Sequence, residues 1–160
     1  MTSSQTEERS STPLHAKIEQ MLTEARVVLP GAQALFGFQL AIVLTQSFED
    51  LPGSSKMTHA ASLLLVALAV VLLIAPAAYH RIVYAGEDSQ DMHRVGSALV
   101  TAATVPLALG LAGDVYVVIT KLVGLPTAGF IAGSLSLVFL IGLWHAYPLV
   151  AAHLRSRVAT

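Results

Sequence analysis

Four long runs of apolar residues dominate the pattern along the chain. They cover about residues 27–48, 60–79, 95–120 and 127–150. A hydrocarbon core of about 30 Å needs roughly 20 apolar residues in helical form to span it, and each run meets that length. Charges or turn formers fill the connections between the runs. The pattern predicts an all-α fold: an integral membrane four-helix bundle.

A different pattern precedes the first run. Residues 1–12 are polar and rich in Ser and Thr, so we expect a disordered tail and no signal peptide. Thr12-Pro13 suits a helix start, and apolar residues then recur every three or four positions. Residues 13–26 are therefore predicted to form a cytoplasmic amphipathic helix, which either lies on the membrane surface or extends the first span. Pro30-Gly31 offers a kink where the chain enters the bilayer.

Basic residues are distributed unequally over the connections. Seven of the nine Lys and Arg residues fall on the side of the termini and the second loop, against Lys56 and Lys121 on the other side. Because Lys and Arg are enriched in cytoplasmic loops, both termini are predicted to be cytoplasmic. Residues 27–150 then form one membrane domain, and residues 151–160 form a cytoplasmic tail.

The composition excludes several classes of function. Charged residues make up 12% of the chain, hydrophobic residues 54%, and the formal net charge is -1. A soluble domain carries about 25% charged residues. Membrane lipid is therefore the expected partner, and nucleic acid is not. Cysteine is absent, which excludes thiolate metal sites. No P-loop, dinucleotide fingerprint or HExxH motif occurs, so an enzyme is expected only as a redox bundle.

Polar side chains inside the runs are the candidates for coupling an ion or a proton. Asp114 is the one acidic residue well inside a predicted span, in its outer half, and an intramembrane carboxylate indicates function by default. The alternative is an interfacial aspartate that faces water or His59. Gln33, Gln39 and Gln46 lie in the first run, and the last two are nearly on one helix face. Their side chains either form hydrogen bonds between helices or line a polar path for an ion or a proton.

Three histidines fall in the cytoplasmic half of the predicted bundle: His80, His93 and His145. Paired histidines on facing helices at matched depth are what haem b requires in a bundle. Arg81 and Arg94 flank the first two, which suits contacts with lipid headgroups or carboxylates equally well. No other cofactor and no metal is expected.

Small residues at a helix-packing spacing occur in the fourth run. Gly129 and Gly133 form a GxxxG pattern, which lets helix backbones approach closely. We expect these glycines to pack the four helices of one chain rather than to form a dimer face.

Two stretches are distinctive together: residues 24–36, EARVVLPGAQALF, and residues 72–81, LLIAPAAYHR. They resemble a family of small bacterial membrane proteins of unknown function, whose members are often labelled sodium:proton antiporters. The similarity runs from about residue 18 to residue 124. It implies a bacterial cytoplasmic membrane and cation/proton exchange, which a chain of four spans would perform as a homo-oligomer.

The same stretches place polar residues at the predicted cytoplasmic boundary: Glu24, Arg26, His80 and Arg81. Ion pairs from Glu24 or Asp91 to the arginines would clamp the helix ends. Alternatively, the cluster binds an anionic lipid headgroup or a proton. The leading function is a small transport-related membrane protein. A non-catalytic accessory or lipid-interacting protein and a haem b electron-transfer bundle are the alternatives.

Overall fold

The computed structural model describes residues 13–85 and 87–158, and all regular elements in these ranges are helices. Four helical segments are long and apolar enough to cross a membrane, which confirms the predicted all-α membrane fold of four spans. The predicted tail over residues 1–12 lies outside the described residues. The elements are α2 (Leu14–Ile42), α3 (Gln46–Glu49), α4 (Gly53–Val83), α5 (Gln90–Val123), α6 (Pro126–Ile141), the π-helical turn η1 (Gly142–Ala146) and α7 (Tyr147–Val158).

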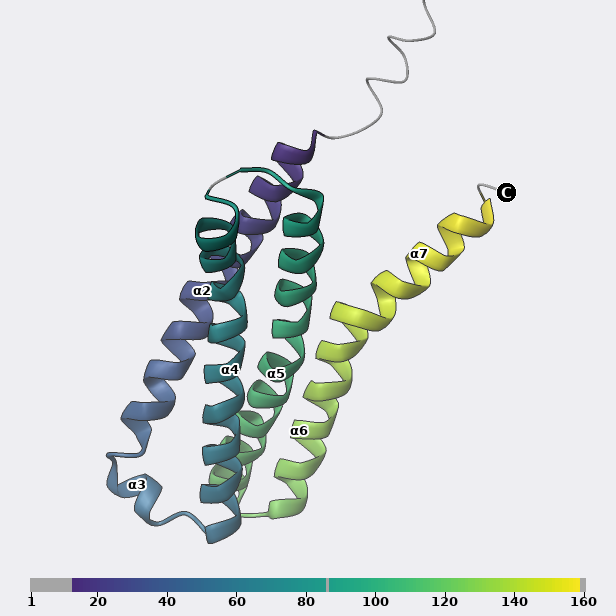
Figure 1. Cartoon of the computed structure of the whole chain (residues 1–160). Helices are drawn as coiled ribbons and strands as arrows, with labels where there is room; N and C mark the ends of the chain where they lie inside the picture. Colours follow the sequence, from purple (N-terminus) through teal and green to yellow (C-terminus); the bar gives the residue numbers. More distant parts are fainter. Residues whose placement is uncertain (1–12, 86, 159–160) are drawn as a thin grey trace, which may run out of the picture.

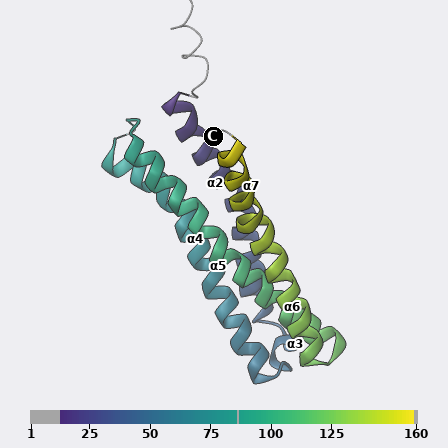
Figure 2. The same cartoon turned by 90° about the vertical axis from the view of Figure 1, so that its right-hand side faces the viewer.

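Helix α5 occupies the centre of the arrangement (Figure 1). It makes its most extensive contact with α4, packs along α6 on another side, and also contacts α2. Helix α2 packs on both α4 and α5, whereas α6 packs chiefly on α5. Helix α7 continues from η1 and leaves the other helices (Figures 1 and 2). The start of α2 and the end of α7 lie at one end of the bundle, and α3 lies at the other.

Prolines and a glycine set several helix boundaries. Proline at the start of a helix loses no hydrogen bond and has its φ angle preset. Accordingly, α4 follows Pro52, and α6 has Pro126 at its first position. Helix α5 ends at Gly124, whose φ of 75° places it in the left-handed region, and its N–H donates to Thr120 O at 2.9 Å.

Helix α2 begins well before the first apolar run. It continues unbroken from Leu14 through Pro30, so residues 13–26 extend the span and do not form a separate helix. Of the two arrangements that the sequence left open, the extension is the one observed. A bundle of membrane helices tolerates such a proline because neighbouring groups satisfy the freed backbone.

The same helix ends earlier than its apolar run. Thr45 Oγ1 donates to Ile42 O at 2.7 Å and accepts from Phe48 N at 3.3 Å. One hydroxyl therefore terminates α2 and caps α3, because threonine side chains compete with the helical ladder. Gln46 lies in α3, outside the span.

Close helix approach fixes the register of the bundle. The core between α2, α4 and α5 contains four alanines, which allow short interhelix distances. Gly110 of α5 lies against Val66 of α4, and Gly113 lies against Ser62. The same antiparallel register, continued toward α3, brings His59 of α4 close to Asp114 of α5.

Gly129 and Gly133 pack α6 against α5 within the chain, as the GxxxG spacing predicted. Both are buried. A methyl group on Gly129 would lie 2.6 Å from Tyr116 O, and one on Gly133 would lie 2.9 Å from Ala112 O. The two helices therefore touch backbone to backbone along this seam.

Candidate functional site

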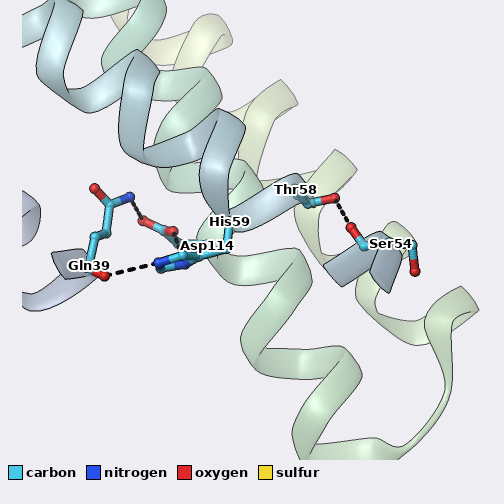
Figure 3. A network of polar contacts seen from close by, with 5 residues as sticks. All are labelled: Gln39, Ser54, Thr58, His59 and Asp114. Atoms are coloured by element: carbon cyan, nitrogen blue, oxygen red, sulfur yellow. Dashed lines mark hydrogen bonds and ion pairs between the residues drawn. The ribbon is translucent and has the colours of Figure 1, made fainter. Parts of the chain in front are cut away.

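A polar cluster joins α2, α4 and α5 near the end of the bundle that carries α3 (Figure 3). Gln39 of α2 donates from Nε2 to Oδ2 of Asp114, which lies on α5, at 2.7 Å. Nε2 of His59, on α4, lies 3.0 Å from the backbone oxygen of Gln39. Nδ1 of the same ring lies 3.9 Å from Oδ1 of Asp114. Each helix thus contributes one side chain to a single cluster.

The cluster is buried and lies inside the spans. Gln39 is 3% exposed and His59 5% exposed, while the Asp114 side chain retains 18% exposure. His59 lies about 9 Å along α4 from its start, and Asp114 lies about 14 Å from the end of α5, at a rise of about 1.5 Å per residue. The ring of Phe48, on α3, packs edge-on against His59 with a centroid distance of 5.2 Å. Helix α3 therefore covers the cluster from that end.

Hydrogen-bond donors and acceptors determine which atoms can hold a proton here. A backbone carbonyl only accepts, so Nε2 of His59 donates, and in the neutral ring Nδ1 carries the lone pair. Since Gln39 occupies Oδ2 of Asp114, Oδ1 is the carboxylate oxygen that faces this lone pair. One proton on either group makes the contact attractive, because a neutral carboxyl donates to Nδ1 and an imidazolium donates to Oδ1.

The amide oxygen of Gln39 is a buried acceptor without a hydrogen-bond partner in the described part of the chain. An unsatisfied buried polar atom of this kind costs about 1–3 kcal/mol. A half-turn of the amide would exchange its nitrogen and oxygen, so that Oε1 faced the Asp114 carboxylate. Two oxygens side by side are the ligands that hard cations prefer.

The structure brings only some of the sequence candidates together. Asp114 and Gln39 meet, and Asp114 faces His59, one of the alternatives that the sequence left open. Gln33 is exposed on α2, and Gln46 is exposed on α3. The prediction that Gln39 and Gln46 share one helix face is wrong, because α2 ends before Gln46.

Sequence reasoning named His59 only as a possible neighbour of Asp114 and not as a site residue. A signal for it was present in the spacing of α4. Ser55, His59 and Ser62 recur at four and three residues and are all buried. Polar residues at that spacing share one helix face, which here points toward α5.

The expected clamp at the opposite end does not form among the described residues. Glu24 accepts a bond at 3.2 Å from a glutamine one turn earlier, and Asp91 pairs at 3.1 Å with an arginine on its own helix. Arg26 and Arg81 are exposed and make no ion pair with any residue in 13–85 or 87–158. His80, beside Arg81, has a buried Nε2 without a hydrogen-bond partner.

The histidines considered for haem lie on three different elements. His80 ends α4, His93 lies in the first turn of α5, and His145 lies in η1. Thr104 Oγ1 lies 2.9 Å from Nε2 of His145 and donates to Thr101 O at 2.6 Å, so the imidazole nitrogen is the donor in the first contact. In residues 13–85 and 87–158, no group of three or more His, Asp or Glu could hold a metal. Haem binding stays a prediction.

The fold and the cluster define a class: an all-helical membrane protein of four spans with a polar site between three of them. The profile of DUF6328, a family of unknown function, matches residues 7–148. The match covers most of the chain, which therefore belongs to this family. No curated protein and no solved structure matches the chain. The antiporter label and the bacterial origin stay predictions.

Proposed function

We propose that this membrane protein exchanges a cation for a proton at Asp114. The observation that carries the proposal is the Asp114 carboxylate, bound by Gln39 and facing His59 between three helices. The sequence has no other Asp or Glu from residue 95 to its end, and none in α4. An ionisable side chain in a span is costly, so its presence favours a functional role.

In the proton-bound form, Asp114 carries the proton on Oδ1, the carboxyl oxygen that faces Nδ1 of His59 at 3.9 Å. Loss of that proton leaves a carboxylate, and a half-turn of the Gln39 amide supplies a second oxygen for a cation. Support for this step comes from the buried Gln39 Oε1, which has no hydrogen-bond partner among the residues that the structure describes. Proton and cation neutralise the same charge, so their binding is mutually exclusive, as exchange requires.

Exchange across the whole bilayer is proposed to involve a homo-oligomer. One chain offers one such cluster, near one end of the spans. Phe130, Val138 and Phe139 on α6 are each about 70% exposed, which supports a lipid-facing or subunit-facing surface. The mass of the purified protein in nanodiscs measures the number of copies.

The test is cation-driven proton flux in proteoliposomes that contain a pH dye. Wild-type protein should move protons when a sodium or potassium gradient is applied. Asp114→Asn should abolish this flux yet keep the fold, because the Asn carbonyl still accepts from Gln39. Asp50→Asn, which changes an exposed carboxylate after α3, is the matched control and should keep the flux. Wild-type flux in Asp114→Asn, or none in the wild type, would contradict the proposal.

A non-catalytic, lipid-interacting protein is the second candidate. It is favoured by Arg26 and Arg81, which are exposed at the end opposite to Asp114 and form no ion pair with the described part of the chain. A haem b bundle is the third candidate, and a Soret band in protein purified from haem-replete cells would decide for it. A colourless preparation would exclude it.

A further inference from the structure

A groove of about 180 Å³ runs between α2 and α4, toward the end at which the chain termini lie. Leu22 and Leu29 of α2 line one wall, and Ile74 and Ala77 of α4 line the other. The side chain of Arg26 completes the lining. The groove is therefore apolar except for one guanidinium.

Apart from Leu22, the lining residues come from the two stretches on which the family resemblance depends. Residues 24–36 supply Arg26 and Leu29, and residues 72–81 supply Ile74 and Ala77. Arg81 lies four residues beyond Ala77, one turn further along the same face of α4. Arg26 thus lies within one wall, and Arg81 lies one turn beyond the other wall, toward the end at which the chain termini lie.

Neither Arg26 nor Arg81 stabilises the fold through a polar contact with the described residues. Both are exposed, and neither makes a hydrogen bond or an ion pair within residues 13–85 and 87–158. The nearest acidic residue in sequence, Glu24, lines a different cleft with Ala16 and Thr23. Positive charge at this groove is therefore not neutralised by the protein.

The depth of the groove matches a membrane boundary. Ile74 lies about 31 Å along α4 from Gly53, and Arg81 lies about 42 Å along it. The apolar run over residues 60–79 is about 29 Å of helix, so Ile74 and Ala77 lie in its last turns and Arg81 lies just beyond its end. The apolar walls then border acyl chains, while Arg81 reaches the level of the headgroups.

We propose that this groove binds an acidic phospholipid, with one acyl chain between α2 and α4 and the phosphate on Arg26 and Arg81. Guanidinium groups bind phosphate oxygens in a bidentate manner, which suits one arginine in the groove wall and a second one turn beyond it. The apolar walls require an apolar occupant, which a free phosphate lacks. The site is distinct from the Asp114 cluster and does not depend on it.

The headgroup is tested by measuring lipid binding to the purified full-length protein with native mass spectrometry. Phosphatidylglycerol should bind more tightly than phosphatidylcholine. Arg26→Gln and Arg81→Gln should each weaken phosphatidylglycerol binding about fivefold, the factor expected per basic residue at an anionic surface. Arg155→Gln, an exposed arginine on α7, is the control and should bind like wild type. Equal affinity for both lipids, or equal losses in all three variants, would overturn the proposal.

The acyl chain is tested by filling the groove. Ala77→Phe should block it, whereas Ala78→Phe places the same side chain at an exposed neighbour that does not line it. Phosphatidylglycerol binding should fall in the first variant and persist in the second, and inorganic phosphate should not compete. Equal binding by the two phenylalanine variants, or displacement of the lipid by phosphate, would exclude an acyl-chain site. Asp114→Asn should bind the lipid normally, which separates this result from the outcome of the flux assay.

Discussion

Replacing Gly129 by alanine is expected to loosen the docking of α6 on α5. The added methyl group would lie 2.6 Å from Tyr116 O and would also meet the Thr120 hydroxyl. Ordinary contact begins near 3.4 Å, so the helices must separate by about 0.8 Å. Overpacking of this kind costs about 1–3 kcal/mol, and the higher helix propensity of alanine returns up to about 1 kcal/mol. With the full propensity gain the expected net loss is about 0–2 kcal/mol. The loss falls on a helix that packs chiefly on α5.

The assay is equilibrium unfolding in bicelles by titration with a denaturing detergent. A cysteine pair introduced across α5 and α6 gives a second readout, because the natural chain has no cysteine to compete for the crosslink. Gly142→Ala is the control, since nothing lies within 4 Å of its added methyl group. Gly129→Ala should unfold earlier and crosslink less efficiently than Gly142→Ala. Equal stability and equal crosslinking of the two variants would refute the backbone contact.

Three further outcomes are expected. A reporter that is active only in the cytoplasm should work at the C-terminus and fail near Gly53, and the reverse would invert the predicted orientation. His15, in the first turn of α2 and ahead of the apolar segment, bonds Asp88 at 2.7 Å, and this bond raises the pKa of His15 above 6.5. The ion pair between His15 and Asp88 is therefore fully formed below pH 6.5 and is lost as the pH rises through the raised pKa of His15. In an NMR titration of His15, Asp88→Asn should lower the titration midpoint. An unchanged midpoint would show that the bond does not form. Phe48→Ala should lower stability by about 1 kcal/mol through loss of the ring contact with His59, whereas wild-type stability would mean that α3 does not cover the cluster.

The sequence determined the features that depend on local chemistry. Four spans follow from apolar length, because a hydrocarbon core of fixed thickness requires about the same number of helical residues each time. Proline and glycine set boundaries such as Pro126 and Gly124, because one has a fixed φ angle and the other adopts a positive one. The glycine seam of α6 was also predictable, since close approach of membrane helices needs small residues.

Only the tertiary structure decided which polar residues meet. Gln33, Gln39 and Gln46 all lie in the first apolar run, yet only Gln39 of the three is buried, because a threonine hydroxyl ends α2 before Gln46 and packing fixes the rotation of the helix. The register between α4 and α5 brings His59 opposite Asp114. Likewise, Arg26 lines one groove with Ala77 although the two are distant in sequence. The depth and rotation of each helix depend on side chains packed across helix interfaces, and the pattern along one helix does not record them.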